Sequence, residues 1–189
     1  MKLLVVTSNP HKAEEIRSYF GGAIEVEDVR LECPECRHDD VAEIARYKAE
    51  FAWEKLGQPL IVDDTAFSID SLSGFPGPYA AYVFYKIGNE GILRLTEGKC
   101  RDAHFETAIA YADSSGIRVF RGVFSGRIVE PRGREGFGYD PIFEWNGRTL
   151  AEIPLDEKSR ISHRALALRE LHDWLLAGGE HMKWVSHNC

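Results

Sequence analysis

The chain has 189 residues, of which 44% are hydrophobic and 28% charged, and its formal net charge at pH 7 is -7. This composition is typical of a globular protein with one core or two small lobes. The acidic balance argues against a broad nucleic-acid-binding surface. The lack of a long apolar run or signal peptide argues against a membrane span and predicts a cytoplasmic protein.

The cysteines give a weak metal signal. Cys33 and Cys36 have the spacing of half a zinc knuckle, and His38 follows them, but no second close pair supplies the remaining ligands. We therefore expect Cys33, Cys36, Cys100 and Cys189 to be reduced thiols.

The first predicted elements are an apolar strand over residues 3–6 and a helix that continues to residue 20. Between them lies a polar turn made of Thr7, Ser8, Asn9, Pro10, His11 and Lys12. Asn9 or Ser8 can cap the helix, and free N–H groups, hydroxyls and Lys12 then meet at its N-terminus, as in many phosphate sites. The glycine-rich P-loop pattern is absent, and a well-capped helix without a ligand explains the same residues.

The next elements are a strand over residues 24–31 and a helix from residues 39–40 to about residue 56. Lys48 lies on this helix, where it either reaches a ligand or is solvated. A short buried strand over residues 60–62 then ends at Asp63 and Asp64, where ligands gather in open sheets. Adjacent strand residues point to opposite faces, so both carboxylates face one cleft only if the chain turns there.

The middle of the chain predicts helices over residues 79–86 and 90–96 and an antiparallel hairpin of strands 104–111 and 117–129. In the glycine-rich segment 136–143, Phe137 either stacks on a flat ligand or packs on the core. Ser162 caps a last helix ending at residue 176, which places His163 and Arg164 in its first turn. Cations there oppose the helix dipole and indicate an anionic neighbour.

Four motifs together resemble those of the inosine triphosphate pyrophosphatase family, and they span nearly the whole chain. These motifs are Thr7-Ser8-Asn9-Pro10-His11-Lys12, Val62-Asp63-Asp64-Thr65, the segment 136–143, and Glu157-Lys158 with Ile161-Ser162-His163-Arg164. The resemblance, which is strongest to archaeal members, implies an α/β fold. It implies an elongated mixed β-sheet in two lobes flanked by helices, with a central substrate cleft. It also implies a single catalytic domain over residues 1–189, a tail near residues 178–189, and a homodimer.

The resemblance also implies roles for single residues. Asp64 corresponds to the catalytic base and a metal ligand, and Glu35 corresponds to the second metal ligand. Asp63 and Glu43 match acidic positions whose role stays open. The substrate-binding positions are Thr7, Ser8, Asn9, Pro10, His11, Lys12, Lys48, Thr65, Phe137, Gly138, Tyr139, Asp140, Lys158, His163 and Arg164.

Two departures from the family pattern bear on this assignment. Thr65-Ala66 replaces the usual Ser-Gly, and alanine is less free than glycine to adopt a positive φ. Ala80-Ala81-Tyr82 replaces the Ser-Ala-Arg of bacterial members, so the segment supplies no arginine.

The activity that the resemblance implies is hydrolysis of the non-standard purine nucleoside triphosphates ITP, dITP and XTP to a monophosphate and pyrophosphate. Mg²⁺ is the expected cofactor, and Asp64 deprotonates the attacking water. Lys12, Lys158 and Arg164 are expected to stabilise charge on the departing pyrophosphate. Hydrogen-bond donors such as His163 favour bases with an oxygen at C6. The alternative is a non-catalytic nucleotide- or RNA-binding module.

Overall fold

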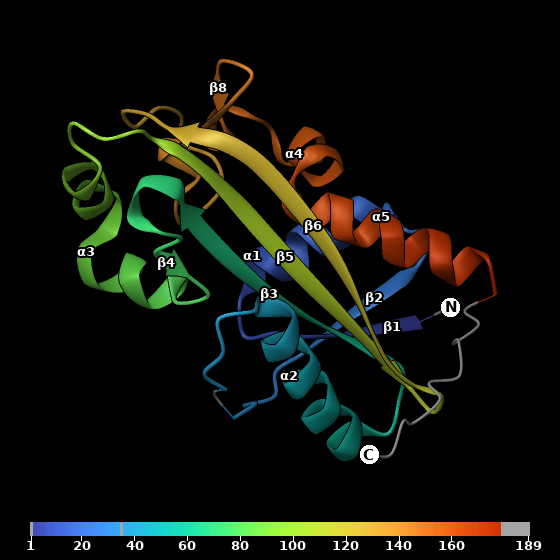
Figure 1. Ribbon diagram of the computed structural model, residues 1–189. Coiled ribbons are helices and arrows are strands. Elements are labelled where there is room, and N and C mark those ends of the chain that lie inside the picture. The colour runs from blue at the N-terminus through green and yellow to red at the C-terminus, as the bar shows by residue number, and fades with distance from the viewer. Residues whose placement is uncertain (1, 35, 179–189) are drawn as a thin grey trace.

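The computed structural model describes residues 2–34 and 36–178 (Figure 1). The strands are β1 (Lys2–Val6), β2 (Glu25–Val29), β3 (Leu60–Ile69), β4 (Pro76–Gly77), β5 (Asp102–Asp113), β6 (Gly116–Ile128), β7 (Phe143–Trp145) and β8 (Arg148–Thr149). The α-helices are α1 (Pro10–Phe20), α2 (Val41–Leu56), α3 (Ala80–Leu95), α4 (Leu155–Ile161) and α5 (His163–Leu176).

The strands form one mixed sheet in the order β2-β1-β3-β5-β6-β7-β8, and β4 pairs with β3. β1 runs parallel to β2 and β3, whereas β3, β5 and β6 pair antiparallel. The predicted α/β fold with an elongated mixed sheet flanked by helices is therefore confirmed.

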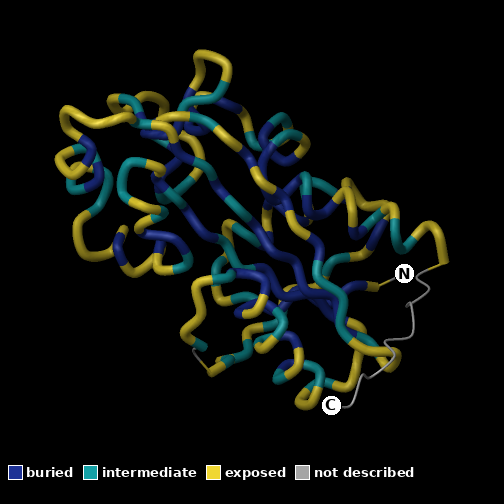
Figure 2. The backbone as a smooth tube through the Cα atoms, in the orientation of Figure 1, coloured by how far each residue is buried: buried dark blue, intermediate teal, exposed yellow. Residues whose placement is uncertain are grey.

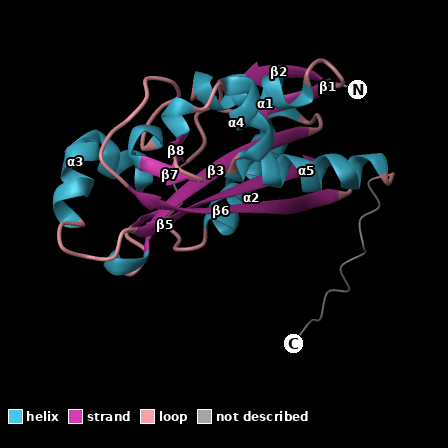
Figure 3. Ribbon diagram, turned by 90° about the horizontal axis from the view of Figure 1, so that it is seen from above, coloured by secondary structure: helices cyan, strands magenta, loops and turns pink. Residues whose placement is uncertain are grey.

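Three long strands, β3, β5 and β6, run through the molecule from one end to the other (Figures 1 and 3). At one end a core of mainly aromatic and branched side chains, including Phe67, Phe105 and Phe143, packs around α3 and β7. At the other end the sheet has a core on each face, one against α2 and one against α1 and α5. Figure 2 shows the buried stretch continuing along these strands.

The helix boundaries follow from their caps. The Asn9 side chain accepts a hydrogen bond from the His11 amide at 3.0 Å, and α1 ends where Gly21 adopts φ 54. The Asp40 side chain accepts from the Ala42 amide at 2.8 Å and caps α2. Ser162 caps α5 through the Ala165 amide, as predicted. The short helix α4, which precedes this cap, is not predicted from the sequence.

The prediction that the third strand ends at Asp63 and Asp64 is wrong. β3 continues to Ile69 because its pairing with β5 stays in register, with Asp64 opposite Ala108 and Ile69 opposite Ala103. Since the strand does not turn, the two carboxylates project from opposite faces of the sheet. The two helices predicted over residues 79–96 form the single element α3, interrupted by non-helical backbone at Gly88.

Among the helices of the described residues, none is both long enough and apolar enough to cross a bilayer. The predicted tail lies, from residue 179 onward, outside the described residues, and so does Cys189.

Candidate functional site

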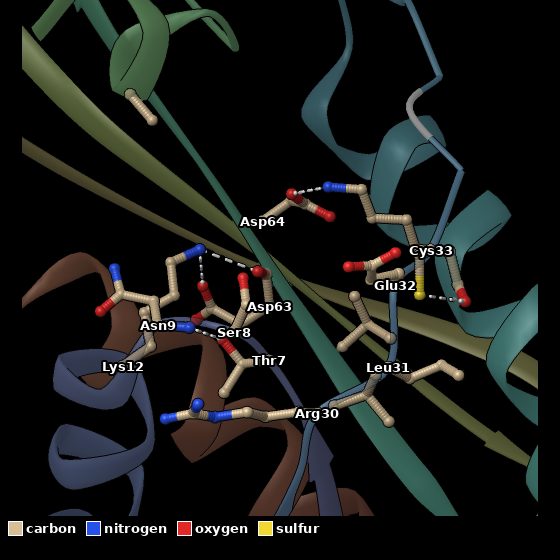
Figure 4. Close-up of a pocket in the computed structure, with 14 residues that line it drawn as sticks. Thr7, Ser8, Asn9, Lys12, Arg30, Leu31, Glu32, Cys33, Asp63 and Asp64 are labelled. Carbon is tan, nitrogen blue, oxygen red and sulfur yellow. Dashed lines mark hydrogen bonds and ion pairs between the residues drawn. The ribbon is translucent and has the colours of Figure 1, made fainter. Parts of the chain in front are cut away.

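A cavity of about 890 Å³ opens beyond the carboxyl ends of β1 and β2, beside the point in β3 where its parallel pairing with β1 ends at Val62 (Figure 4). Ligands of open α/β sheets bind at this edge. The polar and charged residues that line it are Thr7, Ser8, Asn9, Lys12, Arg30, Glu32, Lys48, Asp63 and Asp64.

The turn between β1 and α1 is held in place by its own hydrogen bonds. The Asn9 amide donates to Thr7 Oγ1 at 3.1 Å, and the Thr7 amide donates to the Val29 carbonyl at 3.1 Å. Lys12 Nζ donates to the Asp63 carbonyl at 2.8 Å and lies 2.7 Å from Asp63 Oδ1. Hydroxyls, an ammonium group and the N-terminus of α1 therefore face one cavity, an arrangement that suits an anion.

Asp64 projects toward α2 and carries the clearest chemical signal of the site. Its Oδ1 accepts a hydrogen bond from Lys48 Nζ at 2.7 Å, while Oδ2 is buried and has no partner among the described residues. The Glu32 carboxylate lies on the Asp64 side of the same cavity (Figure 4). A buried carboxylate oxygen without a partner fits a ligand such as a cation or water.

Asp63 projects to the opposite face, where its side chain is fully buried. Its Oδ2 accepts from Arg164 Nε at 2.7 Å, and its Oδ1 accepts from Arg164 Nη2 at 3.3 Å. Although burial by itself raises the pKa of this carboxyl, the charges of Arg164 and Lys12 outweigh burial and hold the pKa far below its usual value.

Glu15 on α1 completes a buried network of alternating charges. One of its oxygens accepts from Arg164 Nη1, and the other lies 2.7 Å from Lys158 Nζ. Burial raises the pKa of Glu15, but the charges of Arg164 and Lys158 outweigh it and lower the pKa to about 2. Lys158 Nζ also donates to Asp140 Oδ2 at 2.6 Å. The network runs in the order Lys12, Asp63, Arg164, Glu15, Lys158 and Asp140.

This network confirms the anionic neighbour expected for the first turn of α5, because Arg164 is paired with two carboxylates. His163 is not part of that charge pattern. Its ring is buried, stacks on Phe105 with centroids 4.7 Å apart, and leaves Nδ1 without a partner among the described residues. Burial, together with the Arg164 charge, lowers the pKa of His163 well below its usual value, so the ring is neutral at pH 7.

A second cavity of about 310 Å³ adjoins the first. Its lining is formed by Asn9, Lys12, Thr65, Ala80, Ala81, Phe84, Phe105, Phe137, Gly138, Tyr139, Asp140, Lys158, His163 and Arg164. The Phe137 ring stacks on His11, with centroids 5.0 Å apart and an interplanar angle of 12°. Asn9, Lys12 and Ala81 line both cavities, so one ligand can extend from one cavity into the other.

The structure brings most of the predicted site residues to the two cavities. Lys158 and Arg164 line the second cavity, and in the described part of the chain they are not among the residues lining the first. Pro10 and His11 are not among the described residues that line either cavity: Pro10 begins α1, and His11 packs on Phe137. The substrate-binding roles of these residues stay predictions.

The predicted acidic ligands have different outcomes. Glu35 lies outside the described residues, so its role as a metal ligand stays a prediction. Glu43 is on the exposed side of α2 and pairs with Arg46 at 3.7 Å. Within residues 2–34 and 36–178, no group of three or more His, Cys, Asp or Glu side chains is arranged to hold a metal. Cys36 and Cys100 are free thiols, and the Cys33 thiol donates to the Lys48 carbonyl at 3.9 Å.

The sequence analysis missed Glu15, Arg30 and Glu32. For Glu15, the spacing from Lys12 is a usable signal, since residues three apart share one side of a helix. Arg30 and Glu32 follow the second parallel strand directly, at the edge where ligands of open sheets bind.

The fold and cleft define a class of α/β proteins in which a mixed sheet carries a polar cavity and an adjoining aromatic one. The model of the Ham1 family matches residues 3–174, and the chain belongs to this family. The dITP/XTP pyrophosphatase of Methanopyrus kandleri is 50% identical over 182 residues, which cover 92% of this chain and 96% of that protein. The dITP/XTP pyrophosphatase of Thermococcus kodakarensis is 46% identical over 180 residues, covering 93% and 97%.

Solved structures agree with this assignment. The Staphylococcus aureus Ham1 protein superimposes with a TM-score of 0.81 at 27% identity, covering 95% of this chain and 100% of that one. The family resemblance predicted from the four motifs is therefore confirmed.

Proposed function

We propose that this protein hydrolyses the non-standard purine nucleoside triphosphates ITP, dITP and XTP to the nucleoside monophosphate and pyrophosphate, and so removes them from the nucleotide pool. The names of its relatives support this substrate class. One structural observation carries the proposal: Asp64, whose Oδ2 has no partner among the described residues, lines a polar cavity that adjoins an aromatic one.

The substrate's orientation follows from the two linings. The purine base enters the second cavity, whose lining includes the Phe137 ring. The phosphates pass Asn9 and Lys12, the polar residues common to both cavities, and continue into the first cavity. Lys12, the Thr7 and Ser8 hydroxyls and the N-terminus of α1 then hold the phosphate oxygens.

Asp64 acts as the general base. It orients and deprotonates a water for in-line attack on the α-phosphorus, and the Lys48 hydrogen bond at 2.7 Å fixes its carboxylate. The site also fits Mg²⁺, which binds few protein carboxylates and several phosphate and water oxygens. Asp64 and Glu35 would hold the ion, which when bound draws negative charge from the phosphate oxygens.

The choice of base follows from hydrogen-bond polarity. Hypoxanthine and xanthine present an acceptor oxygen at C6, whereas adenine presents an amino donor. Donors that line the second cavity, from Lys158 and the neutral His163, would pair with the oxygen and face the amino group of adenine unfavourably. Hydrogen-bonding sites discriminate by ~10⁴-fold in such cases.

The biological setting is part of the same proposal. The acidic net charge of -7 supports free nucleotides rather than nucleic acid as substrate and a cytoplasmic location.

The exposed aromatic side chains of α3, Tyr82 and Tyr85 among them, offer a face for a homodimer. Light scattering at several protein concentrations tests the dimer.

The first experiment is to incubate the purified protein with ITP or ATP, each with Mg²⁺ or with EDTA, and to separate the products. The proposal expects inosine monophosphate and pyrophosphate, only with Mg²⁺, and ATP largely unchanged. Inosine diphosphate and phosphate would show attack at another phosphorus and contradict it. Metal-independent binding without turnover would favour a binding module instead.

A further inference from the structure

We infer that Arg30 binds the end of the phosphate chain farthest from the base, and thereby selects triphosphates and holds the departing pyrophosphate. This inference rests on the proposed function. Arg30 matches none of the motifs that carry the family resemblance, and its place in the cleft emerges only from the structure.

The backbone fixes Arg30 beside the phosphate-binding turn. β1 and β2 are parallel, with Val6 opposite Val29, and the Thr7 amide donates to the Val29 carbonyl at 3.1 Å. Arg30 follows Val29 and therefore lies next to Thr7 at the edge of the sheet. In Figure 4 its guanidinium lies on the side of Thr7 and α1, away from Asp64 and Glu32.

The charges of the first cavity give Arg30 a distinct role. Lys12 is paired with Asp63 at 2.7 Å, and Lys48 is paired with Asp64 at 2.7 Å. Arg30 lines the same cavity and is exposed, and among the described residues no carboxylate pairs with it. A triphosphate brings several negative charges into a cavity whose two lysines are already paired with carboxylates. The Arg30 guanidinium is therefore the cation whose positive charge is available to the phosphates.

The position of Arg30 also indicates which phosphates it meets. It lines the first cavity and is absent from the described lining of the second, whereas Lys12 belongs to both. With the base in the second cavity, Lys12 meets the phosphates nearest the nucleoside, and Arg30 meets those that depart as pyrophosphate. A planar guanidinium matches two phosphate oxygens at once. Ala81, in the segment where bacterial members carry an arginine, contributes no charge.

The test compares Arg30→Gln, Arg30→Lys and the control Arg37→Gln, an equal change of charge at an exposed position farther along the same loop. Calorimetry measures the binding of pyrophosphate with Mg²⁺ and of inosine monophosphate. We expect Arg30→Gln to weaken pyrophosphate binding about tenfold and to leave monophosphate binding within about twofold. Arg30→Lys should fall between, and Arg37→Gln should match the wild type.

Kinetics provide a second readout. Arg30→Gln should lower kcat/KM for ITP more than for inosine diphosphate, so the preference for the triphosphate shrinks. Unchanged pyrophosphate affinity, or equal losses for pyrophosphate and monophosphate, would overturn the inference. If the wild type releases no pyrophosphate from ITP, the proposed function fails, while the pyrophosphate titration still decides whether Arg30 is an anion ligand.

Discussion

The buried carboxylate of Glu15 gives the sharpest quantitative prediction. Glu15→Gln preserves the shape of the side chain but removes the charge that faces Arg164 and Lys158. The pKa of Glu15 falls from 4.5 to about 2 in the folded protein, and this difference corresponds to about 3 kcal/mol. The side chain is only 3% exposed, so solvent screening does not reduce this figure. We expect the variant to lose about 3 kcal/mol of unfolding free energy at pH 7.

The same linkage fixes the sign of the pH dependence. Because the folded pKa lies below the unfolded one, the stabilisation is complete above the unfolded value and is lost as the pH falls through the folded value. The difference between wild type and variant should therefore shrink to about 2 kcal/mol at pH 3.5. Urea unfolding at both pH values measures it.

Glu14→Gln is the matched control, because Glu14 is adjacent in sequence but exposed. It should change the unfolding free energy by less than about 0.5 kcal/mol. Equal stability losses in the two variants, or a Glu15→Gln loss that does not depend on pH, would refute the buried-network reasoning.

Three further predictions concern the cleft. Asp64→Asn keeps an oxygen for Lys48 but cannot take a proton, so kcat should fall by at least ~10²-fold while the thermal unfolding midpoint changes little; activity near the wild-type level would exclude Asp64 as the base. Phe137→Leu removes an aromatic stacking contact worth roughly 1–3 kcal/mol of binding free energy. Calorimetry should show that the variant binds inosine monophosphate at least about fivefold more weakly and pyrophosphate with unchanged affinity. Chelation with EDTA should stop pyrophosphate release and added Mg²⁺ should restore it; continued release after dialysis against EDTA would contradict the metal's role.

The sequence predicted the elements whose signals are local. The caps at Asn9 and Ser162 and the hairpin turn after Asp113 depend on a few neighbouring residues, and the structure confirms them. The course of β3 beyond Asp64 could not be predicted, because it depends on pairing with β5 some forty residues later. Asp63 and Asp64 are stable in the middle of this strand because cationic side chains from other elements pair with them.

Prediction of the site had the same limit, because local signals could be read from the sequence and contacts between distant elements could not. The resemblance identified most of the lining, but not which cavity each residue faces. Arg164 has an unfavourable position on its own helix, and only the fold explains it, by bringing Asp63 and Glu15 against it. Glu15 stands outside the recognised motifs, because its role comes from contacts with α5 and α4 rather than from its neighbours in sequence.

The continuity of β3, β5 and β6 has a consequence for engineering this chain. A cut between the two ends of the molecule would sever three hydrogen-bonded strands rather than one linker, so neither half should be expressible as an independent fragment. New termini belong instead at the tight turn between β5 and β6, where Ser115 is exposed and its amide donates to the nearby Asp113 side chain. The same pairing disfavours a hinged swing of one end against the other, because such a swing would have to bend three paired strands.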